Sequence, residues 1–271
     1  MDKAAPLWKW ILLFVLALVL GIMGYGLLQS LAGLVNNPIL TFLGATVLLV
    51  LYFFAVKLIE RTEPSDLPAE RIASDLGLGL LIGAVFISCV VGLILALGWA
   101  NIEPAHFTWK NQFSAFMLFF AVAVGEEILF RGILFRWIDE RWGLAYALLV
   151  SAVIFGAMHI GQPGATVWSC FAIAIEAGLL LGAAYKWSGT LWLPIGIHWA
   201  WNYVQGDVFG VAVSGSDDAP TFFNTIMSGP DIITGGSFGA EASIIAVILG
   251  AALSAMFLYL YFRKTKKAGM A

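Results

Sequence analysis

Long uninterrupted apolar runs dominate this chain and limit what it can fold into. Of its 271 residues, 61% are hydrophobic and only 11% are charged, whereas about a quarter of the residues in a soluble domain carry charge. Several runs exceed the ~18 apolar residues that mark a membrane-spanning helix. The pattern therefore predicts an all-α polytopic protein embedded in a lipid bilayer.

Eight membrane-spanning helices are predicted, joined by short connections except at residues 60–76 and 211–241. They cover approximately residues 8–30, 38–58, 77–99, 112–137, 143–161, 166–187, 190–210 and 242–262. The first is interpreted as a retained helix, because it is too long for a signal peptide and has no small-x-small cleavage site. No internal repeat is found, so residues 1–271 are predicted to form a single membrane-embedded domain.

The distribution of basic residues predicts the orientation of this domain. With both termini in the cytoplasm, every Lys and Arg except Lys110 falls in an inner segment, as the positive-inside rule requires. The compact loops are typical of a prokaryotic protein, which places the predicted multi-pass protein in the cell (inner) membrane.

Two classes of function find no support in the sequence. No basic tract is long enough to indicate nucleic acid as a partner. Cys89 and Cys170 both lie in apolar runs, without the spacing of a metal site or the context of a disulfide. Nothing in the sequence specifies an oligomeric state.

Ionisable residues inside the predicted spans are the candidates for function, because each costs ~2.5–3.5 kcal/mol or more at the centre of a bilayer. If the fourth and fifth spans form an antiparallel hairpin, Glu126 and His159 lie at one depth, within direct or one-water reach of ~3–6 Å. His198 reaches a similar depth on the seventh span. The complete set is Glu126, Glu127, Arg131, His159, Glu176 and His198.

The spacing within each helix suggests a way to activate water. Glu127 and Arg131 are four residues apart and can form an ion pair on one helix face. His198 and Asn202 have the same spacing, so both side chains can point to one site. Glu126 is then a candidate general base, with His159 opposite it to share the water or its proton. His198 and Asn202 can donate to a developing oxyanion. Phe155 lies one turn before His159 and forms an aromatic wall.

Each of these residues also has an ordinary structural interpretation. Glu127 and Arg131 alone can be an ion pair that fixes helix packing, and a lone His or Asn can be an interhelical hydrogen bond. The functional hypothesis depends on three spans converging at one depth. Glu176 on the sixth span is not needed by this scheme.

The motifs resemble the CAAX protease and bacteriocin-processing family, also called the Abi family, of intramembrane glutamate proteases. This family includes the Ras-converting CAAX endopeptidase. Its EExxxR motif is present as EEILFR, with Glu126, Glu127 and Arg131; its FxxxH motif as FGAMH, with Phe155 and His159; and its HxxxN motif as HWAWN, with His198 and Asn202. The three occur in the expected order, within about residues 112–210.

The resemblance implies an intramembrane endopeptidase whose substrate is a peptide or a membrane protein. It makes Glu126 the general base with His159, gives Glu127 and Arg131 a supporting role, and assigns the oxyanion hole to His198 and Asn202. No cofactor is expected, although Glu126, His159 and His198 are also plausible zinc ligands with an open fourth position.

Two alternative functions remain open at this point. The same buried charges can serve as the coupling site of a membrane transporter, although no internal repeat of the kind many transporters show is found. A non-proteolytic binding or immunity protein is the other alternative, although binding alone does not require a complete set of catalytic motifs.

Overall fold

The structure of the chain is a computed structural model, and it describes Trp8 and residues 37–61, 63–216 and 221–269. The first predicted span, 8–30, lies outside these residues apart from Trp8. Within them, the fold is predominantly helical, and six helices are long and apolar enough to cross a membrane. The protein is therefore an integral multi-pass membrane protein. The total of eight spans and the orientation of the termini remain predictions.

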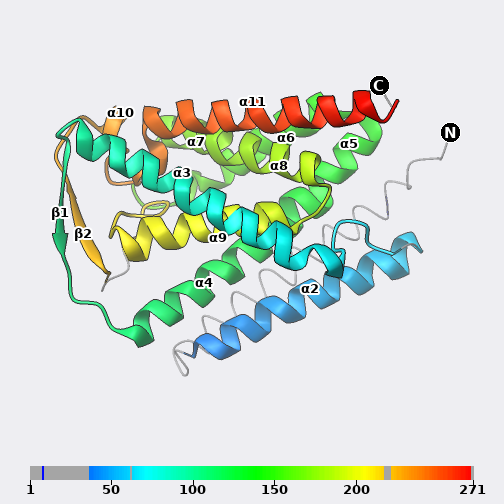
Figure 1. Cartoon of the computed structure of the whole chain (residues 1–271), viewed down its shortest axis with the longest axis horizontal. Coiled ribbons are helices and arrows are strands. Elements are labelled where there is room, and N and C mark those ends of the chain that lie inside the picture. Colours follow the sequence, from blue (N-terminus) through cyan, green and yellow to red (C-terminus); the bar gives the residue numbers. More distant parts are fainter. Residues whose placement is uncertain (1–7, 9–36, 62, 217–220, 270–271) are drawn as a thin grey trace.

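Five of the predicted spans correspond to long helices, and each begins or ends near its predicted boundary (Figure 1). They are α2 (Pro38–Glu60), α3 (Gly77–Ala96), α4 (Trp109–Glu127) continuing through the π-helical η3 (Ile128–Phe135) into α5 (Arg136–Trp142), α6 (Leu144–Met158) with the 3-10 turn η4 (His159–Gly161), and α11 (Ile244–Lys267). A sixth, the predicted span 166–187, consists of α7 (Val167–Ile173), the π-helical η5 (Ala174–Leu179) and α8 (Leu180–Ser188). The short segments η1 (Ala69–Arg71) and η2 (Ile72–Leu76) precede α3.

Polar side chains cap the helices where the apolar runs begin. The Asn37 side chain accepts from the backbone N–H of Ile39 at the start of α2, and Thr108 accepts from Asn111 at the start of α4. Ser243 does the same for α11. Each cap satisfies one of the free N–H groups of a first helical turn, which fixes where the helix starts.

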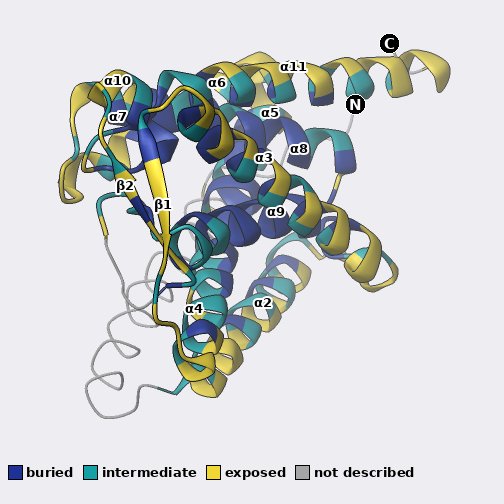
Figure 2. Cartoon of the chain, turned by 60° about the vertical axis from the view of Figure 1, so that its left-hand side comes forward, coloured by how far each residue is buried: buried dark blue, intermediate teal, exposed yellow. Residues whose placement is uncertain are grey.

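The predicted seventh span, 190–210, is not among the helices long and apolar enough to cross a membrane. α9 (Trp192–Tyr203) has only 12 residues, followed by the π-helical η6 (Val204–Val208). Every residue from Trp192 to Asn202 is buried, and Figure 2 places α9 in the interior, while α2, α3 and α11 carry exposed faces. α9 is thus a core helix surrounded by protein, whereas the outer helices expose large apolar side chains such as Leu81, Leu149 and Tyr259 to the surrounding lipid.

Glycines allow α3 to approach this central helix closely. A Cβ on Gly79 would lie 2.4 Å from the carbonyl oxygen of Leu193, and one on Gly83 would lie 2.2 Å from that of Ile197. Gly79 and Gly83 have the small-xxx-small spacing that lets membrane helices pack backbone to backbone. Phe86, one turn further along α3, packs its ring 4.8 Å from that of Trp201. This packing holds one side of α9 in place.

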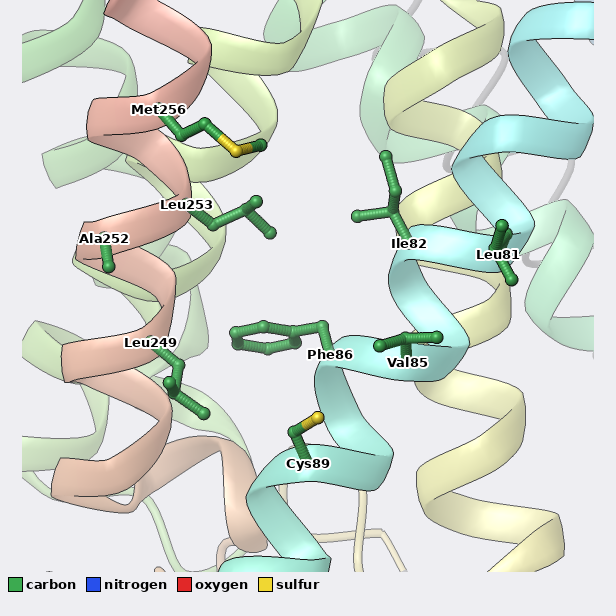
Figure 3. Close-up of a pocket in the computed structure, with 9 residues that line it drawn as sticks. All are labelled: Leu81, Ile82, Val85, Phe86, Cys89, Leu249, Ala252, Leu253 and Met256. Atoms are coloured by element: carbon green, nitrogen blue, oxygen red, sulfur yellow. The ribbon is translucent and has the colours of Figure 1, made fainter.

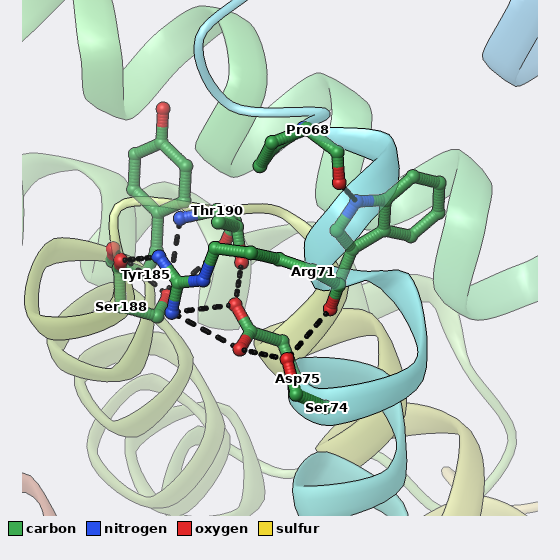
Figure 4. A network of polar contacts seen from close by, with 8 residues as sticks. Pro68, Arg71, Ser74, Asp75, Tyr185, Ser188 and Thr190 are labelled. Carbon is green, nitrogen blue, oxygen red and sulfur yellow. Dashed lines mark hydrogen bonds and ion pairs between the residues drawn. The ribbon is translucent and has the colours of Figure 1, made fainter.

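A polar network fixes the start of α9 (Figure 4). Arg71 donates to the backbone carbonyl of Ser188, at 2.8 Å, and to the Asp75 carboxylate, at 3.0 Å. Thr190 donates to the other oxygen of Asp75 at 2.6 Å, and the indole N–H of Trp192 donates to the carbonyl of Pro68 at 3.0 Å. These bonds join the segment before α3 to the turn between α8 and α9.

The all-α prediction needs one correction, because a small sheet forms at one end of the bundle. β1 (Ala100–Pro104) pairs antiparallel with β2 (Phe223–Met227), with Ala100 opposite Met227 and Pro104 opposite Phe223. The segment predicted as a long loop, 211–241, also contains α10 (Asp231–Thr234) and the 3-10 turn η7 (Ala240–Ala242) at its end. The strands are only five residues each, and although β1 (ANIEP) alternates apolar with polar residues, β2 (FNTIM) does not, so the sequence signal for this sheet is weak.

The predicted orientation can be tested with the two ends of α11. Figure 1 shows the C-terminal end of α11 at the opposite end of the bundle from β1 and β2. Arg263, Lys264, Lys266 and Lys267 lie at that end, so we expect it in the cytoplasm. Protease added outside intact cells should cut an epitope inserted after Ser216 and leave a C-terminal epitope intact. Cleavage of the C-terminal epitope under the same conditions would contradict the orientation.

Candidate active site

The first motif lies at the junction of α4 and the π-helical η3. Glu126 and Glu127 are the last two residues of α4, and Arg131 lies in η3. The Glu127 and Arg131 side chains are both completely buried, with Arg131 Nη1 2.9 Å from Glu127 Oε1. The ion pair expected from their spacing is therefore present. Adjacent residues on a helix point about 100° apart, and the Glu126 side chain is accordingly 35% exposed.

Arg131 links this motif to the neighbouring helix. Its Nη2 donates to the backbone carbonyls of Ala177, at 3.1 Å, and Gly178, at 3.2 Å, both in the π-helical η5. Irregular turns of this type release carbonyl groups from the regular helical pattern, and such groups need other donors when buried. The guanidinium also lies 4.7 Å from the centre of the Phe155 ring, within range of a cation–π interaction.

The third motif reaches the first through His198. Nδ1 of His198 is 2.9 Å from Glu127 Oε1, and its Nε2 is 3.9 Å from Glu126 Oε2. Because a carboxylate oxygen can only accept, Nδ1 of His198 carries the proton of the shorter bond. Glu127 thus accepts from both Arg131 and His198. The sequence did not predict this link, since it depends on which face of α9 meets α4.

Phe155 joins the second motif to the other two. Its ring centre lies 5.0 Å from that of His159 and 6.4 Å from that of His198, and Arg131 lies against the same ring. Nδ1 of His159 donates to the carbonyl of Phe155 at 2.8 Å. The neutral ring then has its lone pair at Nε2, which is available to accept a proton or a water.

Two parts of the predicted geometry stay predictions. Within the described residues no ion pair joins Glu126 to His159, so only the water-bridged form of their predicted contact is left to test. Asn202 is buried, at 9% exposure, one helical turn after His198, but no hydrogen bond of its side chain is found in the described part of the chain. Its predicted donation to an oxyanion is likewise untested.

Glu176 lies in η5, beside the carbonyls that bind Arg131. It is completely buried, and neither carboxylate oxygen has a hydrogen-bond partner among the described residues. Helix α11 packs closely against the backbone at Glu176, because a Cβ on Gly250 of α11 would lie 2.7 Å from Glu176 Cα.

Glu126, His159 and His198 are the alternative zinc ligands. In the ranges that the structure describes, no group of three or more His, Cys, Asp or Glu side chains is arranged to hold a metal ion. Glu126 and His198 approach each other, but His159 binds a backbone carbonyl through Nδ1.

A separate apolar pocket of about 550 Å³ lies between α3 and α11 (Figure 3). Phe86 and Cys89 line one side, and Leu249, Leu253 and Met256 line the other. No ionisable carboxylate, histidine or basic residue lines it. This pocket is therefore not where the motif residues meet.

Comparison with known families agrees with this geometry. The family model described as type II CAAX prenyl endopeptidase Rce1-like matches residues 108–204. The match begins at the cap of α4 and includes all three motifs. Over this segment, the chain is similar to the Rce1-like family. The resemblance inferred from the motifs is thereby confirmed, and the rest of the chain lies outside the match.

One curated protein is similar to part of the chain. The chain is 32% identical over 77 residues to the uncharacterized protein YpbD of Bacillus subtilis (strain 168), which is 28% of this chain and 35% of that protein. The chain thus spans about a third of the length of this relative. No solved structure matches the chain.

Proposed function

We propose that this Rce1-like protein is an intramembrane endopeptidase that hydrolyses peptide bonds with water activated by Glu126 and His159. One observation carries the proposal: the two ring nitrogens of His198 face Glu127 at 2.9 Å and Glu126 at 3.9 Å. A buried imidazole between two carboxylates brings the first and third motifs into one site. The Phe155 ring brings in the second motif.

In the proposed reaction, Glu126 removes a proton from a water molecule as the water oxygen attacks the substrate carbonyl. Glu126 suits this role because it is the accessible member of the glutamate pair, whereas Glu127 is completely buried and already accepts two hydrogen bonds. His159 shares the water or its proton through Nε2, since Nδ1 is held by the carbonyl of Phe155. The proton then passes to the leaving amine as the peptide bond breaks.

The negative charge that develops on the carbonyl oxygen needs donors. Glu127 holds Nδ1 of His198 and stabilises positive charge on the ring, so that Nε2–H can donate to the oxyanion. Asn202, one turn further along α9, is proposed as the second donor. Arg131 donates to the same oxygen of Glu127 and keeps this side chain in place.

The test is a cleavage assay with detergent-solubilised protein and a peptide library, in which mass spectrometry identifies the products. We expect the parent protein to cleave a subset of the peptides and Glu126→Gln to cleave none. Glu103→Gln, an exposed glutamate on β1, is the matched control and should cleave as the parent does. A parent protein without any cleavage would contradict the proposed function.

A second assay separates the oxyanion role from a metal site. Asn202→Ala should lower turnover by on the order of 10²–10³-fold, as expected for loss of one oxyanion donor. The exposed Asn224→Ala on β2 should have no effect. Chelators should leave the activity of the parent unchanged, because the proposed scheme requires no metal ion. About one zinc per chain, with activity lost to a chelator and restored by zinc, would contradict this scheme.

A further inference from the structure

Glu241 is a buried carboxylate that the three motifs do not use. It lies in η7, directly before α11, and is 2% exposed. Its Oε1 accepts from the backbone N–H of Ser214, at 2.6 Å, and from the Ser214 hydroxyl, at 2.9 Å. Its Oε2 accepts from Nε2 of Gln205 at 3.1 Å. Three donors converge on it, which is an arrangement built for a carboxylate.

One of these bonds ties Glu241 to the helix that carries the third motif. Gln205 lies in η6, three residues after Asn202 and seven after His198, close to the same helical face. Its Oε1 accepts from the indole N–H of Trp201 at 3.0 Å, and its Nε2 also donates to the carbonyl of Ala212 at 2.5 Å. Glu241 therefore fixes the end of this helix through the side-chain amide of Gln205, which also bonds to Trp201 and Ala212.

The same segment packs against the chain that follows His159. A Cβ on Gly215, which has a φ of +78°, would lie 1.7 Å from the carbonyl oxygen of Pro163. Only glycine allows so close a contact between the two backbones. Beside Glu241, the carbonyl of Ala242 accepts from the indole N–H of Trp168 at 2.7 Å. One packed unit is therefore formed by three segments: the residues after the second motif, those after the third motif, and the start of α11.

Burial also affects the ionisation of Glu241. It raises the pKa of the Glu241 carboxyl, whereas the two Ser214 hydrogen bonds and the Gln205 hydrogen bond lower it. The three donors therefore favour the charged form of Glu241 that accepts them. Other charged groups of this region are Glu126, Glu127, Arg131, Glu176 and His198.

We propose that Glu241 is a positioning residue of the active site: with Gln205 and Ser214 it fixes the second and third motifs relative to each other. This inference rests on the proposed function. It predicts an effect on the chemical step, because Glu241 holds in place the segments that follow His159 and Asn202.

The experiment compares kcat and KM of the parent protein with those of three variants. Glu241→Gln keeps the shape but replaces one accepting oxygen with a donor NH2, so it cannot accept from both Gln205 and Ser214. It should lower kcat by about 10–100-fold with little change in KM, the factor to which loss of a hydrogen bond to a charged group corresponds. Glu241→Asp keeps the charge and should recover part of kcat. Ser214→Gly removes only the hydroxyl donor, and glycine accepts the φ of +48° at this position, so a loss of a few-fold is expected.

Trp168→Phe is the matched structural control, because it removes a hydrogen bond to the residue next to Glu241 and leaves the carboxylate in place. It should keep the kcat of the parent even if the unfolding temperature falls. If Glu241→Gln and Trp168→Phe lose kcat equally, or if Glu241→Gln changes only KM, the inference is wrong although the parent is active. If Glu241→Gln does not fold, Ser214→Gly decides, and an unchanged kcat in that variant contradicts the proposal. Absence of activity in the parent is instead a failure of the proposed function.

Discussion

Replacing Glu126 with Gln should lower peptide hydrolysis by at least about 10³-fold, towards the upper end of what a general base contributes. Gln has nearly the same shape but cannot accept the proton of the attacking water. The side chain is 35% exposed, so the change places no unpaired group in the core. The fold should therefore be retained, with an unfolding temperature in detergent close to that of the parent protein.

His159→Ala should reduce hydrolysis nearly as much, because it removes the second group that shares the water. The comparison with Glu127→Gln is informative in a different way. From the sequence, Glu127 is only the partner of Arg131, and its loss should be mild; in the structure it also accepts from Nδ1 of His198. We therefore expect Glu127→Gln to lower both stability and turnover, whereas Glu126→Gln lowers turnover alone. Near-normal hydrolysis in Glu126→Gln would show that another group is the base.

Removing Arg131 should produce the largest loss of stability, about 3–5 kcal/mol, the cost of leaving one partner of a buried ion pair without the other. The guanidinium is completely buried and donates to Glu127 and to the carbonyls of Ala177 and Gly178. Arg131→Met fills a similar volume but leaves the Glu127 charge and both carbonyls without these donors. Thermal unfolding in detergent measures the effect.

The double variant Glu127→Gln with Arg131→Met separates the charge from the packing. It removes both members of the pair, so it should recover part of the stability lost in Arg131→Met. It should not recover activity, because His198 has then lost its carboxylate partner. Lys110→Met, at an exposed position, controls for the change of residue type. An unfolding temperature of Arg131→Met within a degree of the parent value would contradict the structural importance of the pair.

The sequence was most informative where an interaction lies within one helix. The spacing of four between Glu127 and Arg131 predicts their ion pair, and the same spacing places Phe155 beside His159; both contacts are present. The long apolar runs predict membrane-spanning helices, and the described residues contain six that qualify. Such predictions succeed because helix geometry alone fixes which residues share a face.

Interactions between helices could not be obtained in this way. In a soluble helix the apolar stripe shows which side is buried, but these helices are apolar all round, so the sequence does not reveal which face meets which neighbour. The hydrogen bond between Glu127 and His198 depends on the rotation of α9 against α4. The role of Glu241 depends on η7 packing beside Gln205 and Ser214, and an isolated carboxylate before an apolar run was its only signal.

The sequence by itself determined that this is a multi-pass membrane protein with three motifs of the CAAX protease type, because composition and short-range spacing carry that information. Only the tertiary structure decided that α9 lies in the core, that a two-stranded sheet closes one end of the bundle, and that Glu127 serves two motifs at once. Close packing at Gly79 and Gly83 and hydrogen bonds between distant segments produce these features. They arise from the complementarity of several surfaces, and no local stretch of the chain encodes that complementarity alone.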